Sequence, residues 1–153
     1  MKIKANIANR LACNVPSFEK MAEVFRAAYE QMRSSYSGRS NGSSNAICIS
    51  DFDESLRLFS VSVLSVSLRI QFLPFLDSSG VLVGQVAIQE VSPCGRRPQA
   101  SILRFTEEGS VEAFIENDRY PDELSLREWL PDVVLSVVFD VLQGRARATF
   151  ENE

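Results

Sequence analysis

The clearest pattern of apolar and polar positions lies at residues 56–72, which read LRLFSVSVLSVSLRIQF. Apolar residues alternate there with serine, arginine and glutamine, which is typical of a strand with one buried face. The alternation changes phase: apolar residues have odd numbers from Phe59 to Val63 and even numbers from Leu64 to Phe72. Such a change fits one long strand with a β-bulge, or two strands joined by a tight turn at Leu64-Ser65. Because neither Asn-Gly nor Asp-Gly is present, the pattern favours the bulged strand.

Shorter segments with the same kind of alternation predict further strands. They are 2–7, 46–49, 81–91, 100–106 and 111–116, the first of them a candidate edge strand. Turn residues separate them: Pro74 ends the first long strand, DSSG at 77–80 predicts a hairpin turn, and a second hairpin is expected around EEG at 107–109. Gly84 is a candidate for a second bulge.

A first helix is predicted between Pro16 and Ser35, with Ser17 as its N-cap. Apolar residues recur there at three- and four-residue spacing and form one core-facing stripe: Phe18, Met21, Phe25, Ala28, Tyr29 and Met32.

A second helical region is predicted near the C-terminus. Ser125 and Glu128 have the spacing of a capping box, so a helical turn is expected there. Pro131 interrupts that turn and begins a helix that stops at Gly144. Its polar stripe is narrow, so this helix must be buried on more than one side, against the N-terminal helix or against a second subunit.

Strands that are segregated from helices indicate the α+β class. We expect an N-terminal helix, an antiparallel curved sheet of about five to six strands and a C-terminal helix. Residues 1–153 are expected to form a single α+β domain, with a flexible Ser/Gly/Asn-rich loop at 37–46.

Composition indicates the cellular compartment in which we expect the protein. The chain has 153 residues, of which 45% are hydrophobic and 24% charged. Its N-terminus has no secretory signal pattern, and no run approaches the roughly 20 apolar residues of a membrane span, so we expect a cytoplasmic protein. Three scattered cysteines, Cys13, Cys48 and Cys94, suit reduced thiols, each expected as a small buried hydrophobe.

Few residues of the chain are candidates for catalysis or metal binding, because it has no histidine. This removes Ser-His and Cys-His nucleophile pairs and the commonest transition-metal ligand. The G-x-S-x-G match at 38–42 lies in the flexible loop, and Ser17 to Lys20 matches S-x-x-K without the companion motifs. The acidic run at 51–54 lacks the residues of a calcium loop and is expected to be a solvated turn. We therefore expect no enzymatic activity, no cofactor and no metal.

The distribution of charge is the most informative feature. Residues 1–106 have a net charge of +4, whereas residues 107–132 carry nine acidic side chains and two arginines, a net charge of −7. Such a segment repels nucleic acid and attracts basic protein surfaces. Phe114 lies between Glu112 and Glu116 on one face of a predicted strand, as an aromatic anchor would. Alternatively, this segment is not an interface but a solvated edge strand whose charges prevent aggregation.

These features favour a non-enzymatic protein-binding module, most simply an inhibitor of a basic target such as a nuclease, of the immunity-protein, antitoxin or phage-inhibitor kind. The predicted partner-binding residues are Glu107, Glu108, Glu112, Phe114, Glu116, Asp118, Tyr120, Asp122, Glu123 and Trp129. A dimer that resembles a secretion chaperone is a close variant. A small-molecule binder or small enzyme with a pocket between sheet and helix, and a self-assembling structural subunit, are the other hypotheses.

Overall fold

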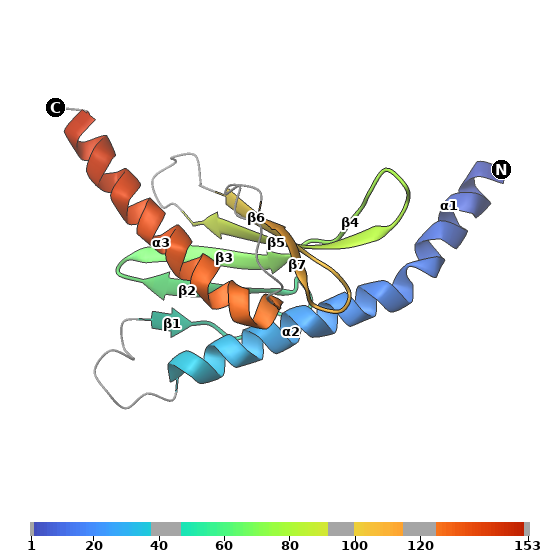
Figure 1. Ribbon diagram of the computed structural model, residues 1–153, viewed down its shortest axis with the longest axis horizontal. Coiled ribbons are helices and arrows are strands. Elements are labelled where there is room, and N and C mark those ends of the chain that lie inside the picture. The colour runs from blue at the N-terminus through green and yellow to red at the C-terminus, as the bar shows by residue number, and fades with distance from the viewer. Residues whose placement is uncertain (1, 38–46, 92–99, 115–124, 152–153) are drawn as a thin grey trace.

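The computed structural model of the protein describes residues 2–37, 47–91, 100–114 and 125–151 (Figure 1). Its elements are α1 (Lys2–Cys13), α2 (Val15–Ser37), β1 (Ile47–Ile49), β2 (Leu58–Val63), β3 (Val66–Phe72), β4 (Phe75–Leu76), β5 (Leu82–Glu90), β6 (Ala100–Phe105), β7 (Val111–Phe114) and α3 (Leu126–Glu151). The predicted α+β class is confirmed. The loop predicted at 37–46 lies almost wholly outside the described residues.

The strands form one antiparallel sheet in the order β1-β2-β3-β5-β6-β7, and the short β4 pairs with β5. Both hairpin turns predicted from the sequence are confirmed. Gly80 N donates to Asp77 O (3.0 Å) in the first turn, and Gly109 N donates to Thr106 O (2.9 Å) in the second. Both glycines have a positive φ, of 82° and 91°, which glycine adopts without steric cost.

The prediction of one bulged strand at 56–72 is wrong, and the alternative of two strands is confirmed. Leu64 and Ser65 form a two-residue turn with φ of 47° and 66°, the backbone of a type I′ hairpin. Val63 pairs with Val66 and Phe59 with Ile70. Because each pair joins an odd number to an even one, the two-residue turn itself produces the change of phase.

One face of the sheet is buried, and α2 and α3 cover it together (Figure 1). Alternate residues of β2, β3, β5 and β6 share a single core with the inner faces of both helices. α3 packs against α2 and β3. Because α3 is apolar on most sides, it must be buried on more than one side, and α2 buries the side that the sheet does not.

The opposite face of the sheet carries small polar side chains. Ser60, Ser62 and Ser67 are half-buried there, and the hydroxyl oxygens of Ser62 and Ser67 lie 3.2 Å apart. Arg69 donates to Gln89 (2.7 Å) on neighbouring strands. Cys48 is exposed, and so is Cys13 on α1, which corrects the expectation that these two cysteines are buried; Cys94 lies outside the described residues.

The N-terminal segment differs from the prediction. Residues 2–7 belong to the helix α1 rather than to an edge strand, because Ile3, Ile7 and Leu11 recur at the helical spacing of four. Ser17 is not the N-cap of α2: the helix begins at Val15, and the carbonyl oxygen of Asn14 accepts the first hydrogen bond, from Phe18 N (2.9 Å). Pro16 lies in the first turn of α2, where its missing N–H costs no helical hydrogen bond.

α3 is longer and more continuous than predicted. It begins after Ser125, whose carbonyl oxygen accepts from Trp129 N (3.0 Å), but Pro131 does not divide it and Gly144 does not end it. One proline removes a single helical hydrogen bond, and one glycine costs only about 1 kcal/mol. The packing of α3 against α2 and β3 outweighs both costs.

Gly84 is not a bulge. Its pairing with β6 is regular, and a Cβ atom at Gly84 would lie 2.7 Å from Cζ of Phe105. The glycine therefore leaves room for the Phe105 ring, which lies over Gly84 on the neighbouring strand. The register shift lies instead between β6 and β7, at Arg104 and Phe105.

The Leu64-Ser65 turn generates a stability prediction. Leu64 is 67% exposed and has a positive φ, a conformation that asparagine tolerates better than leucine. We expect Leu64→Asn to raise the free energy of unfolding by about 0.5–1 kcal/mol, measured by urea denaturation. Leu56→Asn is the matched control, because Leu56 is also exposed but is not a positive-φ residue; an equal gain in both variants would contradict the backbone explanation.

The burial of α3 generates a second prediction. Val137 is 3% exposed, whereas the adjacent Ser136 is exposed. Val137→Asp buries an unpaired charge and should lower the free energy of unfolding by about 3 kcal/mol or more, while Ser136→Asp should change it by less than about 0.5 kcal/mol. Thermal denaturation followed by circular dichroism measures both variants, and a Val137→Asp protein with the wild-type melting temperature would show that α3 is not buried against α2.

Candidate functional site

A groove beside the predicted acidic segment lies where the start of α2 meets two hairpins. It has a volume of about 390 Å³. The described residues that line it are Asn14, Ser17 and Met21 at the start of α2, Asp77, Val81, Leu82 and Val83 in the β4–β5 hairpin, and Phe105, Thr106, Glu107, Glu108 and Glu112 in the β6–β7 hairpin. We call this site the acidic groove.

The acidic groove combines an apolar floor with a negative rim. Met21 and Phe105 are buried members of the hydrophobic core, and Leu82 packs against that core. Four carboxylates surround this floor, from Asp77, Glu107, Glu108 and Glu112, and the described lining includes no lysine or arginine. The groove therefore lies over buried core side chains, and its accessible apolar surface comes chiefly from Val81, Leu82 and Val83, bordered by negative charge.

The β6–β7 hairpin places three of the four carboxylates. A Cβ atom at Gly109 would lie 3.4 Å from Cγ1 of Val24, so the hairpin rests directly on α2. Leu126 N donates to Gly109 O (2.7 Å), which ties the same turn to the start of α3. Both helices thus hold the hairpin, and Glu107 and Glu108 lie at its tip.

The β4–β5 hairpin forms the opposite wall. Oδ1 of Asp77 accepts from Ser79 N (2.9 Å), Ser79 Oγ (2.7 Å) and Val81 N (2.9 Å). These hydrogen bonds, chiefly those from the Ser79 hydroxyl and the Val81 N–H, lower the pKa of the Asp77 carboxyl below its usual value. Asn14 joins this hairpin to the helices, since its Nδ2 donates to Arg10 O (2.8 Å) and to Gly80 O (3.4 Å).

The acidic groove includes some of the predicted partner-binding residues. Glu107, Glu108 and Glu112 line it. Phe114 pairs through its backbone with Leu103. Trp129 is half-buried against the core, and its Nε1 has no hydrogen-bond partner among the described residues. The remaining predicted residues lie outside the described part of the chain: Glu116, Asp118, Tyr120, Asp122 and Glu123.

The other lining residues of the groove were not predicted. The sequence predicts Met21 as part of a core-facing stripe and Asp77 as part of a hairpin turn. Asp77 and Glu107 lie far apart in the sequence and meet only because β5 and β6 are neighbours in the sheet. No local sequence pattern predicts that these two residues line the same groove.

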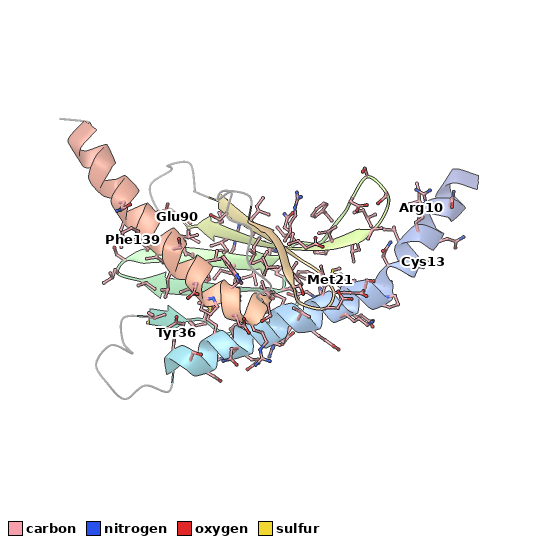
Figure 2. All side chains as sticks on the ribbon, viewed as in Figure 1. Arg10, Cys13, Met21, Tyr36, Glu90 and Phe139 are labelled. Carbon is pink, nitrogen blue, oxygen red and sulfur yellow. The ribbon has the colours of Figure 1, made fainter. Side chains whose placement is uncertain are left out.

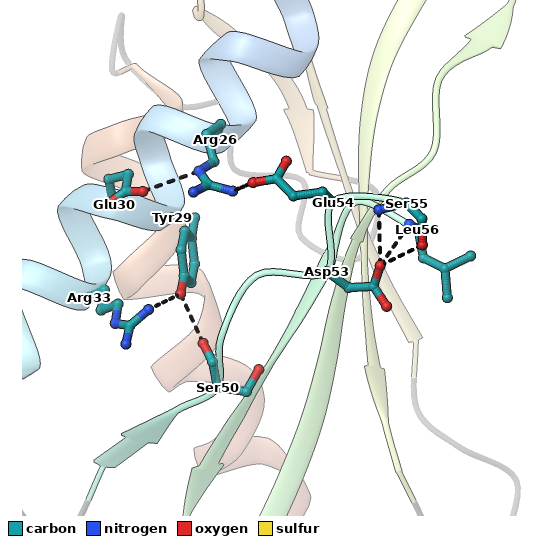
Figure 3. Close-up of polar contacts among 9 residues, drawn as sticks. All are labelled: Arg26, Tyr29, Glu30, Arg33, Ser50, Asp53, Glu54, Ser55 and Leu56. Carbon is teal, nitrogen blue, oxygen red and sulfur yellow. Dashed lines mark hydrogen bonds and ion pairs between the residues drawn. The ribbon is translucent and has the colours of Figure 1, made fainter.

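A second polar cluster explains the acidic run at 51–54, and Figure 3 shows most of it. Arg26 on α2 pairs with Glu30 (3.1 Å) and with Glu54, and Arg33 pairs with Asp51 (3.0 Å). The guanidinium of Arg26 also lies 4.5 Å from the ring centroid of Phe52. Asp51 and Glu54 thus fasten the loop before β2 to α2. Among the described residues, no three acidic, cysteine or histidine side chains are arranged so that they could hold a metal ion.

A polar pocket of about 340 Å³ lies between the end of α2 and the start of α3. Its described lining includes both Arg127 and Glu128, and Arg127 Nη2 donates to Gln31 Oε1 (2.8 Å). This pocket carries both a positive and a negative side chain, and Arg127 is already hydrogen-bonded to Gln31. It therefore favours neither cationic nor anionic ligands, unlike the acidic groove.

The hydrogen bonds of Asp77 generate a pH prediction. Asp77→Asn keeps the Oδ1 acceptor and removes the charge. Because the folded pKa lies below the usual 3.8, the carboxylate stabilises the fold above that pH, and the contribution is lost as the pH falls through the folded pKa. Urea denaturation at several pH values should show wild type more stable than Asp77→Asn at pH 7, with the difference vanishing in strong acid. A difference that does not change with pH would contradict this assignment.

The chain matches no known protein-family model, no curated protein and no solved structure. Among the described helices, none combines the length and the apolar character that a membrane crossing requires. The function is therefore inferred from the shape and charge of the acidic groove.

Proposed function

We propose that the protein is a non-enzymatic binding module, and that its acidic groove accepts a basic segment of a partner protein. The observation that carries this proposal is the joining of four carboxylates, from Asp77, Glu107, Glu108 and Glu112, around an apolar floor in the described lining of one groove.

The charge of the groove favours a basic partner. Clustered carboxylates raise the local concentration of cationic segments and accelerate their association, and they repel nucleic acid. Asp77 keeps its charge to lower pH than an ordinary aspartate because of its hydrogen bonds in the hairpin turn. The effect weakens with salt, because the Debye length falls from roughly 10 Å at 0.1 M to about 3 Å at 1 M.

The apolar floor favours a partner segment that carries aliphatic or aromatic side chains as well as lysine or arginine. Leu82 and Val83 are half-buried, and the neighbouring Val81 is 56% exposed. A leucine that becomes fully buried against them contributes about 1.5–3 kcal/mol. Charge therefore governs how fast the segment arrives, and apolar contact governs how long it stays.

An inhibitor that covers the basic surface of a target such as a nuclease is the simplest form of this function. An immunity protein, an antitoxin and a phage-type inhibitor share that physical requirement. A chaperone-like dimer that holds a segment of another protein is the variant form.

A small-molecule ligand is the second candidate, because a volume of about 390 Å³ lies within the usual range for ligand pockets of roughly 300–1,000 Å³. Such a ligand would be a cation with an aliphatic chain, of which a polyamine is the simplest probe. Calorimetry with spermidine tests it.

The test of the proposal is binding of a labelled peptide in which leucine and lysine recur at helical spacing. A matched peptide with glutamate in place of lysine is the ligand control. Fluorescence anisotropy should show binding of the lysine peptide alone. Glu108→Lys with Glu112→Lys should weaken that binding at least about tenfold, which corresponds to ~1.4 kcal/mol.

Glu19→Lys with Glu23→Lys is the matched protein control, because it makes the same change of net charge at exposed positions of α2 that do not line the groove. This variant should bind the lysine peptide within about threefold of wild type, because neither glutamate is among the described residues that line the groove. Equal losses in the two double variants would mean that net charge alone attracts the peptide, and the proposal would fail.

A further inference from the structure

α1 is a basic amphipathic helix that projects from the body of the molecule (Figure 1). Ile7 and Leu11 of α1, and Val15 at the start of α2, recur at a spacing of four and are 52%, 54% and 49% exposed. Residues 1–18 contain Lys2, Lys4 and Arg10 and no acidic side chain. The helix thus combines an uncovered apolar stripe with positive charge.

α1 needs a partner for its stability. It has 12 residues, and isolated helices of about that length are marginal in water because nucleation is costly. Within the part of the chain that the structure describes, α1 has few contacts with α2 and leaves its stripe exposed. An apolar stripe of this kind stabilises a helix only when another surface covers it.

The acidic groove is complementary to α1 in both properties. Four carboxylates border the groove and its described lining has no basic residue, whereas the N-terminal 18 residues carry three basic side chains and no acidic one. The floor at Leu82 and Val83 is half-buried and offers the apolar surface that Ile7 and Leu11 lack. A helix cylinder of 10 Å diameter and 15 Å length occupies roughly 1,200 Å³, so the groove receives the side chains of one helix face and not the whole helix.

No residue of α1 is among the described residues that line the acidic groove of its own chain. Asn14 lies at the rim of the groove and at the joint between α1 and α2. Its backbone N donates to Leu11 O (3.1 Å), and its side chain donates to Arg10 O and Gly80 O. These bonds tie the joint to the end of α1 and to the β4–β5 hairpin, and Figure 2 shows Arg10 and Cys13 on the helix that projects from the body of the molecule.

We propose that two copies of the chain exchange their α1 helices, so that the acidic groove of each copy receives the α1 helix of the other. The interface is isologous, because each copy contributes one helix and one groove, and it closes as a two-fold dimer. This inference rests on the proposed function, in which the same groove accepts a basic amphipathic segment. It adds a regulation: the dimer occupies its own grooves, so a partner segment must displace α1.

Analytical ultracentrifugation of the full-length protein tests the exchange. Wild type should be a dimer that dissociates more readily as salt is raised. Leu11→Asp should be monomeric, because it places a negative charge on the stripe that faces the carboxylates. Asn9→Asp introduces the same charge on the opposite side of α1 and should stay dimeric, with a dissociation constant within about threefold of wild type. Circular dichroism checks that each variant is folded.

A mixing experiment separates the exchange from other dimers. Leu11→Asp has an intact groove and a defective helix, whereas Glu108→Lys with Glu112→Lys has an intact helix and a defective groove. Each should be monomeric alone, and an equimolar mixture should form a heterodimer through one remaining contact. Absence of a heterodimer, or a groove variant that stays dimeric, overturns the exchange.

Two further results distinguish this proposal from the function on which it rests. Leu11→Asp has a free groove and should bind the lysine peptide at least as tightly as wild type. A monomeric wild type overturns the exchange and leaves the peptide-binding function standing if Leu11→Asp still binds the peptide. Binding of wild type, but not of Leu11→Asp, to vesicles of anionic phospholipid would assign α1 to a lipid surface and would also overturn the exchange.

Discussion

The contact between the aromatic side chains of α2 and those of the sheet is the interaction on which the rest of the structure depends. Phe25 lies 5.9 Å from Phe59 and 5.8 Å from Phe72, and Tyr29 lies 4.8 Å from Phe59, as ring-centroid distances. Phe72 in turn contacts Phe105 (5.9 Å). Aromatic pairs at such distances add about 0.5–1.5 kcal/mol each to the free energy of area burial, and they set α2 across the sheet.

The acidic groove is the end of this core. Met21 and Phe105 belong both to the core and to the lining of the groove, and Gly84 leaves the space in which the Phe105 ring lies. The same packing that stabilises the fold therefore supports the apolar side chains beneath the groove, and the two hairpin turns supply the charges around it. A binding site built in this way is preorganised, so less conformational entropy is lost when a partner binds.

The sequence predicts the class and most of the strands, because alternation and turn residues are local properties. Prediction from the sequence fails where one stretch is compatible with two kinds of structure. The turn at Leu64-Ser65 has no glycine or asparagine and was compatible with a bulge, and residues 2–7 were compatible with both a strand and a helix. The sequence also overestimates Pro131 and Gly144 as breaks, because the packing of α3 is not visible in local sequence. In the site, the charges of Glu107, Glu108 and Glu112 mark the surface, whereas the contribution of Asp77 and Met21 depends on sheet order.

The central claim is that a basic amphipathic segment binds in the acidic groove. Nuclear magnetic resonance of the ¹⁵N-labelled Leu11→Asp protein, titrated with the leucine–lysine peptide, tests it most directly. We expect the perturbed amides to cluster at Ser17, Met21, Leu82, Val83 and 106–112, which line or border the groove. Perturbations confined to the opposite face of the sheet, around Ser62, Ser67 and Gln89, would contradict it.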